Sequence, residues 1–352
     1  MELNLSELLQ KTVELEGSDL FIIPGSEPTV KVHGTLQTLI GIRLTPEDSE
    51  QLVREMYELA HRDMSRIEPD GDDDFSFALT ELSRFRCNAY HQRGSVAAAC
   101  RVVSFGLPSP EDLRIPPQVM ELADRIDGMI LVTGPAGSGK STTLACMVDR
   151  INSTRSCHIV TIEDPIEYLH KHKRSLVSQR EVPNDASTFP SALRAALRQA
   201  PDVVMLGEMR DTETIRTAMT AAETGHLVLS SLHTQGAAKS IDRIIDSFPA
   251  SAQAQTRLQL SMVLGAVVSQ RLIPSLKGGR VPVFEVMTVN PAVQNLIRDG
   301  RTHQIDNVIF GSQGQGMLSM DLELVRLVQE GMISRQTALL YASAPESLAK
   351  RI

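Results

Sequence analysis

The alternation of apolar and polar residues changes character about one third of the way along the chain. The first hundred residues contain two segments with apolar residues at helical spacing, 3–16 and about 45–61. Thr45 can cap the second helix, and Pro46 suits its first turn. Segments that favour strands accompany these helices at 19–23, 29–32, 84–90 and 96–103. The mixture predicts a small α+β domain over residues 1–103.

Residues 104–117 interrupt this pattern with four prolines and a glycine, and we predict that they form a linker. After the linker, apolar strands alternate with helices, which is typical of a parallel α/β sheet. The pattern from about residue 291 onward is mostly helical. We therefore expect a second domain over residues 118–352, with an α/β core and a helical C-terminal region.

Composition and charge exclude several classes of protein. The 352 residues carry a net charge of −8, which gives no support for nucleic-acid binding as the main activity. The four cysteines form no C-x-x-C pair, so a cysteine zinc site is not expected. The acidic run 70–74 lacks the glycine of a calcium loop and is interpreted as a solvated turn before a strand. There is no signal-peptide pattern, and no apolar run approaches the roughly 20 residues of a spanning helix, so any membrane association is expected to be peripheral.

The segment that follows the apolar strand 129–133 is a complete phosphate-binding loop, GPAGSGKS, and a helix follows it to about residue 152. Glycines let backbone N–H groups turn toward phosphate oxygens, and the helix N-terminus adds partial positive charge. Lys140 is expected to reach the β- and γ-phosphates of ATP, and Ser141 to hold Mg²⁺. A glycine turn with an incidental lysine is the alternative, which the flanking strand and helix disfavour. The predicted nucleotide-binding residues here are Gly134, Pro135, Ala136, Gly137, Ser138, Gly139, Lys140, Ser141 and Thr142.

Three later strands are followed by polar residues suited to phosphate chemistry. Strand 158–162 leads to Glu163, strand 202–206 to Glu208, and strand 227–231 to His233. The carboxyl ends of parallel strands lie along one edge of a sheet, the same edge as the phosphate loop. Carboxylates there can bind Mg²⁺ and orient the attacking water. An acidic residue after one strand is often only a helix cap, but this coincidence on one edge favours a site.

Arginines supply the remaining candidates. An isolated arginine is usually a surface residue or a structural ion-pair partner. Phosphoryl transfer, however, needs positive charge on the γ-phosphate beyond one lysine and Mg²⁺. Residues of the first domain could supply it across a domain or subunit interface. The candidates are Arg84, Arg86 and Arg101 in the first domain, and Arg194, Arg198 and Arg210 in the second.

Together these motifs resemble those of the secretion and type IV pilus ATPases, most closely the pilus retraction ATPases of the PilT type. The matching segments are GPAGSGKSTT (134–143), TIEDPIEY (161–168), PSALRAALRQAPD (190–202), DVVMLGEMRD (202–211) and TGHLVLSSLHT (224–234). Shorter matches extend from GSDL (17–20) and KVHG (31–34) to THQI (302–305), so the resemblance covers nearly the whole chain.

The resemblance implies a PAS-like N-terminal domain, a RecA-like ATPase domain and a homo-hexameric ring. It implies ATP and Mg²⁺ as ligands, a cytoplasmic protein peripheral to the inner membrane, and a pilus platform protein in that membrane as partner. Glu163 looks like the glutamate that polarises the attacking water, Glu208 like the one near Mg²⁺, and His233 like the γ-phosphate sensor. Which glutamate is the base stays open. The further residues that match the family's functional positions are His226, of the same box as His233, and Arg86, Arg101, Arg194 and Arg210.

Two features favour retraction over assembly. Assembly and secretion members usually carry a four-cysteine zinc insertion and a longer N-terminal region, and this sequence shows neither. Retraction members carry a segment AIRNLIRE, for which this chain has AVQNLIRD at 292–299, with Gln294 and Asp299 as the main differences. The alternatives are an assembly or secretion ATPase, or an auxiliary PilU-like ring member that hydrolyses little ATP itself.

Overall fold

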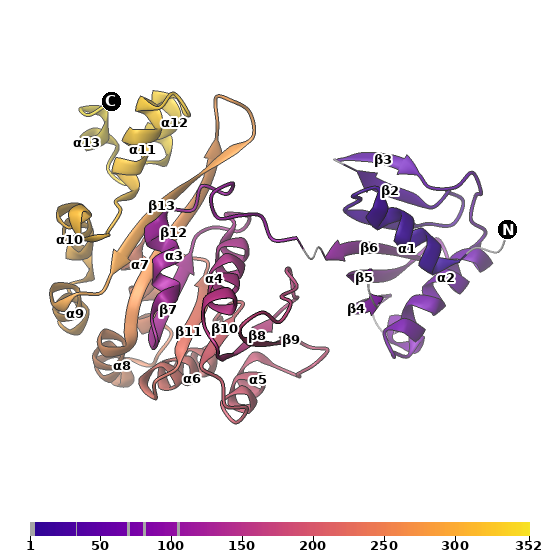
Figure 1. Cartoon of the computed structure of the whole chain (residues 1–352), viewed down its shortest axis with the longest axis horizontal. Coiled ribbons are helices and arrows are strands. Elements are labelled where there is room, and N and C mark those ends of the chain that lie inside the picture. The colour runs from indigo at the N-terminus through magenta and orange to yellow at the C-terminus, as the bar shows by residue number, and fades with distance from the viewer. Residues whose placement is uncertain (1–3, 33, 69–70, 80–81, 104–105) are drawn as a thin grey trace. The chain divides into compact units, whose positions relative to one another are not determined.

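The computed structural model describes residues 4–32, 34–68, 71–79, 82–103 and 106–352 (Figure 1). The chain forms two compact units. Unit 1 comprises Met1–Gly106 and Glu167–Leu169, and unit 2 comprises Leu107–Ile166 and His170–Ile352. Within the described residues, no helix is both long and apolar enough to cross a membrane.

Unit 1 is an antiparallel sheet covered by two helices. The strand order is β3-β2-β1-β6-β5-β4. Leu20, Phe85 and Cys100 point toward α1 and α2 and belong to one apolar core. The elements are α1 (Leu5–Glu14), β1 (Asp19–Ile22), β2 (Thr29–Val32), β3 (Thr35–Thr38), α2 (Pro46–Leu59), β4 (Asp72–Leu79), β5 (Ser83–Gln92) and β6 (Ser95–Val103).

Local chemistry explains where α2 begins, whereas β4 corrects one interpretation of the sequence. Thr45 and Asp48 form a reciprocal capping box at the start of α2, as the Thr45-Pro46 pair led us to expect. The acidic run is not a turn, because Asp72–Asp74 belong to β4; Asp70 lies outside the described residues. Asp73 accepts hydrogen bonds from the Tyr57 hydroxyl at 3.0 Å and from Arg62 at 2.8 Å. Partners distant in the sequence therefore hold this carboxylate against the sheet.

Unit 2 is built on a seven-stranded sheet of order β13-β12-β7-β11-β10-β8-β9, in which only β13 is antiparallel to its neighbour. One apolar cluster packs α3 and α4 on one face of the sheet, and another packs α5 to α10 on the other (Figure 1). The strands are β7 (Gly128–Thr133), β8 (His158–Glu163), β9 (Leu176–Glu181), β10 (Val203–Leu206), β11 (Leu227–Leu232), β12 (Leu264–Pro274) and β13 (Arg280–Thr288). The predicted α/β core with a mainly parallel sheet is thus present.

The helices of unit 2 include the expected helical C-terminal region. Helices α11 to α13 pack on the far part of the long β12–β13 hairpin, around Ile273, Val281 and Val283 (Figure 1). The helices are α3 (Pro117–Glu121), α4 (Lys140–Thr154), α5 (Phe189–Ala196), α6 (Thr212–Glu223), α7 (Ala237–Asp246), α8 (Ala250–Val263), α9 (Pro291–Arg298), α10 (Ile305–Gly311), α11 (Met320–Gln329), α12 (Arg335–Tyr341) and α13 (Pro345–Ala349).

Most of the predicted linker packs against unit 2. Ile115 is buried in the core beneath α3 and α4, and Leu107 and Leu113 pack against the same cluster. The Cys146 thiol of α4 donates to the Pro108 carbonyl at 3.8 Å. Residues 104 and 105 lie outside the described residues. The division 1–103, 104–117 and 118–352 therefore stays a prediction, and a hinge involving all of 104–117 would require this packing to separate.

A buried carboxylate ties β13 to the start of α7. Glu285 is 8% exposed, and its Oε1 accepts the Ala237 N–H at 2.9 Å. Burial raises the pKa of Glu285 to about 7, with Asp306 and Asp321 adding to the rise and Arg271 opposing it. The folded chain therefore holds this proton up to about pH 7, whereas the unfolded chain releases it near the ordinary value of 4.5.

We predict that Glu285→Gln flattens the pH dependence of stability. The contribution of a group with a raised pKa in the folded state falls as pH rises from about 4.5 to about 7, by about 3 kcal/mol in all. Glutamine keeps the acceptor for Ala237 without the charge. At pH 8 the variant should melt above the wild type by calorimetry, and at pH 5 the two should nearly coincide. The exposed Glu346→Gln is the control; a variant equal to wild type at pH 8 contradicts the prediction.

Candidate active site

The phosphate loop connects the carboxyl end of the buried strand β7 to the N-terminus of helix α4. All six residues of β7 are buried, and α4 begins at Lys140. Gly134 has φ +149° and Gly139 has φ +89°, a range that residues with a Cβ rarely adopt. A Cβ on Gly134 would stand 2.2 Å from the Gln270 carbonyl oxygen, and one on Gly139 would stand 2.9 Å from Gln270 Nε2. Gly134 is therefore required on both conformational and steric grounds, and Gly139 on conformational grounds.

The interior of the loop suits an anionic, hydrogen-bonding ligand. Lys140 is 8% exposed, and its Nζ donates to the carbonyls of Gly134 and Pro135, both at 3.0 Å. The hydroxyls of Thr133 and Ser138 are buried and have no hydrogen-bond partner among the residues that the structure describes. Phosphate oxygens are stronger acceptors for a buried lysine than these neutral carbonyls. These residues fit the polyphosphate of a nucleotide.

The order of strands sets how far each predicted residue lies from the loop. β11, β10 and β8 follow β7 in the sheet, and all four are parallel. At about 4.8 Å per strand, the ends of β11, β10 and β8 are about 5, 10 and 14 Å from the end of β7. His233, Glu208 and Glu163 follow or end these strands in that order. The sheet brings all three to the edge that carries the loop, with Glu163 the most distant.

Glu163 is held by two polar neighbours on the surface of the sheet. It is the last residue of β8 and is 8% exposed. Its Oε1 accepts hydrogen bonds from the Thr161 hydroxyl at 2.6 Å and from Gln179 Nε2 at 3.2 Å. Sequence reasoning missed both neighbours. Thr161 could have been predicted, because residues two apart on a strand point to the same face of the sheet. Gln179 could not, because it comes from the adjacent strand β9.

Glu208 forms a cluster of opposite charges with two predicted residues. Its carboxylate, 11% exposed, forms an ion pair with Arg210 and lies 3.2 Å from His233 Nε2. The hydrogen bond and charge of Glu208 raise the pKa of the Arg210 guanidinium above its ordinary value. The structure thus brings together three residues from two different sequence motifs. A metal ion approaching Glu208 would compete with Arg210 and His233 for the same carboxylate.

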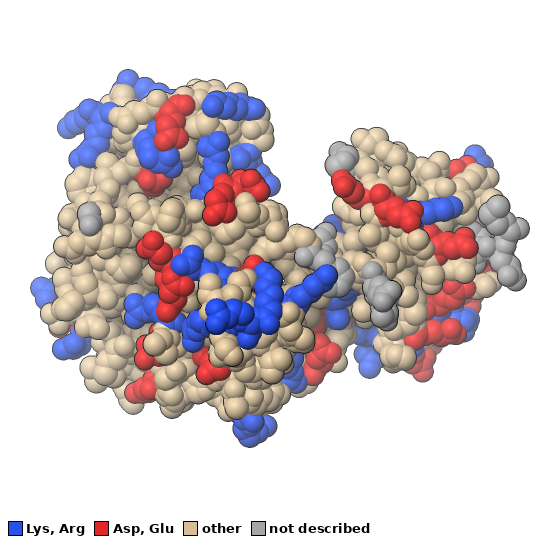
Figure 2. All heavy atoms as spheres, in the orientation of Figure 1, with Lys and Arg blue, Asp and Glu red and all other residues tan. Residues whose placement is uncertain are grey.

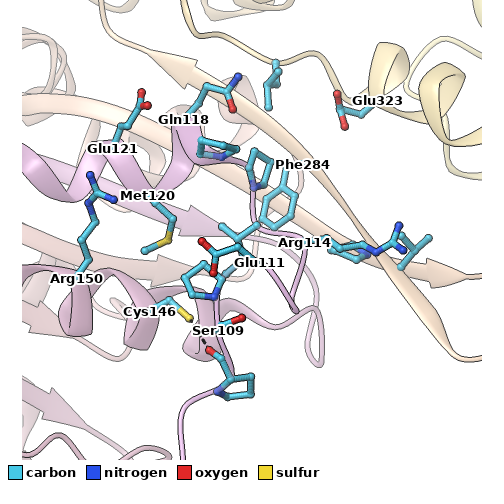
Figure 3. Close-up of a pocket in the computed structure, with 18 of the residues that line it drawn as sticks. Ser109, Glu111, Arg114, Gln118, Met120, Glu121, Cys146, Arg150, Phe284 and Glu323 are labelled. Carbon is cyan, nitrogen blue, oxygen red and sulfur yellow. Dashed lines mark hydrogen bonds between the residues drawn. The ribbon is translucent and has the colours of Figure 1, made fainter. Parts of the chain in front are cut away.

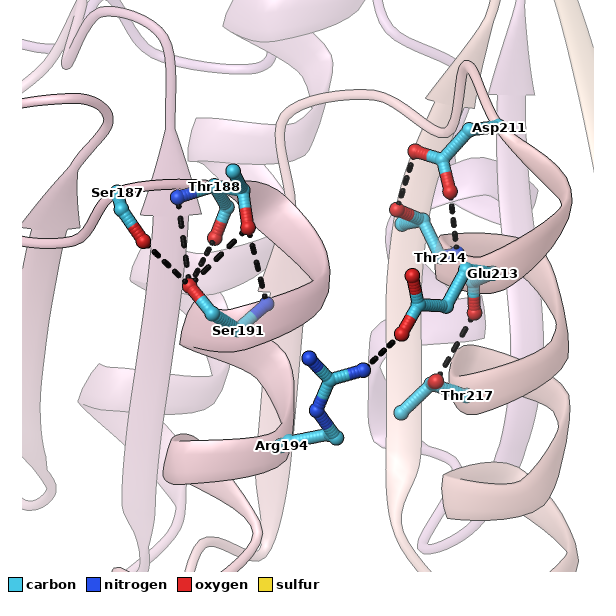
Figure 4. A network of polar contacts seen from close by, with 8 residues as sticks. All are labelled: Ser187, Thr188, Ser191, Arg194, Asp211, Glu213, Thr214 and Thr217. Carbon is cyan, nitrogen blue, oxygen red and sulfur yellow. Dashed lines mark hydrogen bonds and ion pairs between the residues drawn. The ribbon is translucent and has the colours of Figure 1, made fainter.

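Arg194 forms an ion pair between helices α5 and α6. It lies in the last turn of α5 and forms an ion pair with Glu213 in the first turn of α6 (Figure 4). Arg198 donates to the Arg194 carbonyl at 3.0 Å. Glu213 sits beside Asp211, which caps α6 through Thr214 (Figure 4). Arg194 therefore bridges two helices here, in the structural role of an ordinary surface arginine.

The first-domain arginines form a pair on the outer face of unit 1. Arg86 of β5 is opposite Arg101 of β6 in the antiparallel register, and both side chains are exposed. Arg101 also forms an ion pair with Asp19 of β1 at 2.9 Å. Arg84, two residues earlier on β5, is half-buried. Two arginines at directly opposed positions repel one another unless an anion lies between them, which suits a binding role.

His226 lies at the opposite edge of the sheet from the phosphate loop. It immediately precedes β11, next to the start of β7, where its carbonyl accepts the Gly128 N–H at 3.1 Å. Its Nδ1 is 2.9 Å from the Ala221 carbonyl and 3.2 Å from the Thr224 hydroxyl. His226 therefore lies away from the phosphate loop of its own chain, and its expected role in nucleotide binding stays a prediction.

A separate cavity of about 920 Å³ lies between residues 107–118, α3, α4, β13 and α11 (Figure 3). Phe284 and Met120 form part of its apolar wall, and Glu111, Arg150 and Glu323 are among its charged residues. Residues 134–141 are not among the described residues that line it. The cavity is therefore separate from the phosphate loop, and its volume gives no information about nucleotide binding. On the face shown in Figure 2, several Lys and Arg of unit 2 gather in one band, with Asp and Glu beside it.

Comparison with known proteins decides the family. The model of the family "Type II/IV secretion system protein" matches residues 114–326. The type IV pilus retraction ATPase PilT of Pseudomonas aeruginosa is 42% identical over 98% of this chain and 100% of its own. This chain belongs to the type II/IV secretion system protein family. The resemblance inferred from the sequence motifs is confirmed.

Two further members of the type II/IV secretion system family refine the comparison. The type IV pilus ATPase PilU of the same organism is 38% identical over 98% of this chain and 90% of its own. A crystal structure of the pilus retraction motor PilT with bound ADP aligns with a TM-score of 0.90 and 44% identity, over 99% of this chain and 100% of that one. The predicted fold class is confirmed: an α/β unit with a mainly parallel sheet follows a small α+β unit and ends in a helical region.

We predict that Gly134→Ala lowers nucleotide affinity at least tenfold. The added Cβ would meet the Gln270 carbonyl at 2.2 Å, so the loop must move away from β12. Fluorescent ADP titration measures the change. Gly278→Ala in the β12–β13 turn is the control, because its φ is also positive and nothing lies within 4 Å of the added Cβ. Wild-type ADP affinity in Gly134→Ala would contradict the assigned role of the loop.

Proposed function

We propose that this chain is an ATPase that powers retraction of type IV pili. One observation carries the proposal: a complete phosphate loop shares its sheet edge with Glu163, Glu208 and His233. The chain in which this occurs is 42% identical, over nearly its full length, to a pilus retraction ATPase. Loop and acidic residues together support hydrolysis as well as binding of ATP.

The loop binds the polyphosphate of ATP. Its backbone N–H groups and the N-terminus of α4 face the phosphates, and Lys140 exchanges the Gly134 and Pro135 carbonyls for phosphate oxygens. Ser141, exposed in the first turn of α4, and Glu208 are the residues that would hold Mg²⁺. When bound, Mg²⁺ supplies charge neutralisation of the phosphates.

The distances of the two glutamates from the loop suggest different roles, metal binding for Glu208 and activation of water for Glu163. Glu208 lies about two strand spacings away, near enough for the metal-binding side of the phosphates. Glu163 lies one spacing further, where an attacking water would stand beyond the γ-phosphate, and the Thr161 and Gln179 bonds to Oε1 fix its orientation. We therefore assign Glu163 as the base. His233 reports the γ-phosphate by exchanging its contact with Glu208.

We predict distinct defects for two substitutions in this site. Lys140→Ala should abolish both ADP binding and ATP hydrolysis, because it removes the only lysine of the loop. Glu163→Gln should lower phosphate release about 100-fold while ADP affinity stays within threefold, because it removes the base but no phosphate contact. Titration with fluorescent ADP and a phosphate-release assay separate the two effects.

The outcomes of this pair decide the assignment. Glu346→Gln, on the exposed surface of α13, should behave as wild type in both assays. Normal turnover in Lys140→Ala would contradict the proposed function itself. Normal turnover in Glu163→Gln with a loss in Glu208→Gln would instead make Glu208 the base.

The working form is proposed to be a homo-hexamer with nucleotide completed by positive charge from more than one domain. Arg86 and Arg101 are the candidates from the N-terminal domain, and Arg194 and Arg210 are those from the ATPase domain. Movement between the domains is proposed to take place at the predicted linker 104–117. The ring would act in the cytoplasm on a platform protein of the inner membrane, and we propose no nucleic-acid partner.

Retraction is favoured over the alternatives by PilT, which is 42% identical to this chain, whereas PilU is 38% identical and covers this chain to the same extent. Gln294 marks the difference that bears on this choice. It lies half-buried on α9, whose Val293, Leu296 and Ile297 pack into the core. Steady-state hydrolysis distinguishes the two, because a PilU-like auxiliary member would turn over little ATP alone.

We predict that deletion of the gene leaves cells with excess surface pili and without twitching motility. Pili that cannot be withdrawn accumulate, whereas loss of an assembly ATPase leaves bald cells. Counting pili by electron microscopy measures the effect, with complementation by wild type and by Lys140→Ala. Complementation by wild type alone supports an ATP-driven retraction motor, and bald deletion cells would assign the chain to assembly.

A further inference from the structure

One buried residue of β12 touches the phosphate loop at both of its ends. β12 lies beside β7, with Ser269 opposite Thr133, the last residue of β7. Gln270 therefore lies one position beyond the end of that strand, level with the loop. It is 4% exposed. No sequence motif considered above includes it.

Gln270 contacts the loop and α4 through three of its own groups: the backbone carbonyl, Nε2 and Oε1. Its backbone carbonyl closes the space beside Gly134, 2.2 Å from where a Cβ would stand. Its Nε2 closes the space beside Gly139, 2.9 Å from the corresponding point. Its Oε1 accepts a hydrogen bond of 2.7 Å from the hydroxyl of Thr143, which is 1% exposed in the first turn of α4. One residue thus borders the first and last glycines of the loop and the helix that follows.

We propose that Gln270 is a positioning residue that holds the phosphate loop in its nucleotide-binding shape. The inference rests on the proposed nucleotide-binding function of that loop. It concerns the affinity for the polyphosphate rather than the hydrolytic step, because Gln270 lies on β12, on the other side of β7 from β8 and Glu163.

The contacts that Lys140 makes with the loop are lost when nucleotide binds. Lys140 holds the Gly134 and Pro135 carbonyls, and it must release them to reach the phosphates. The contacts between Gln270 and the loop do not have to break when nucleotide binds. They keep the loop N–H groups pointing inward both before and after binding, so no ordering cost falls on the binding step. Gln270 is fixed in turn by the β12 ladder, where it pairs with Phe284 of β13.

The test removes each side of the Gln270–Thr143 hydrogen bond in the full chain. Gln270→Met keeps the volume but loses the acceptor, and Thr143→Val keeps the shape but loses the donor. Each should raise the Kd for ADP and the KM for ATP about tenfold, with kcat within twofold, consistent with one lost hydrogen bond near a ligand. Thr143→Ser, which keeps the hydroxyl, should restore both values.

The double variant decides whether the two residues act as a unit. If they act through one contact, Gln270→Met/Thr143→Val should bind ADP as weakly as either single variant. Thr256→Val is the matched control, because that buried hydroxyl donates to the Ala252 carbonyl at 3.0 Å within α8. It should lower the melting temperature by a similar amount and leave the Kd for ADP unchanged.

Several results would overturn the proposal. One is wild-type Kd and KM in Gln270→Met with only a lower melting temperature, which is the behaviour of an ordinary core residue. Additive losses in the double variant would also overturn it. If Gln270→Met does not fold, Thr143→Val and Thr143→Ser still decide the matter. Absence of ADP binding by the wild type would reject the proposed function instead, so the two failures are distinguishable.

Discussion

The position of β7 inside its sheet is the constraint on which the rest of the site depends. β12 and β11 bond to it along both edges, and all six of its residues are buried. A shift by one residue would break two ladders and turn every side chain to the other face. The end of β7 is therefore fixed, and the loop leaves the sheet at a defined point. Gly134 then follows from the closeness of the Gln270 backbone carbonyl on the neighbouring strand, and Gly139 from its positive φ.

The same strand order separates the tasks of binding and hydrolysis. β11 lies between β7 and β10, so Glu208 cannot approach the loop as closely as His233, and Glu163 is one strand further. A site built on adjacent strands would crowd the metal, the phosphates and the attacking water. Spreading the residues over about 14 Å leaves room for a triphosphate along the sheet edge. Hydrogen bonds from Thr161 and Gln179 then set the direction of the most distant carboxylate.

How much could be predicted from the sequence depended on how far apart in the chain the interacting residues lie. The loop and the Thr45 cap are local patterns, so their positions could be predicted closely. β4 could not, because Asp72–Asp74 resemble a turn, and Asp73 is accommodated only by Tyr57, 16 residues away, and Arg62, 11 residues away. The position of His226 at the edge away from the loop could not be predicted either, because a motif match carries no information about the edge of the sheet on which a residue lies. Gln270 and Thr143, 127 residues apart, leave no local signal.

Most of the charged groups assigned to the nucleotide already have a partner within the chain. Arg101 pairs with Asp19, Arg194 with Glu213, and Arg210 with Glu208. The arginine side chains are 67%, 52% and 69% exposed in these pairs. Glu213 is exposed as well, so the Arg194–Glu213 pair contributes about 0–1 kcal/mol and a polyphosphate can displace it at little cost, whereas Asp19 and Glu208 are 14% and 11% exposed and need another partner when their arginine turns away. Lys140 is the buried cation among these residues, and the Gly134 and Pro135 carbonyls that it contacts are weaker partners than phosphate. Without nucleotide, these cations therefore have partners within the chain. When nucleotide binds, exchanging those partners for phosphate oxygens is favourable.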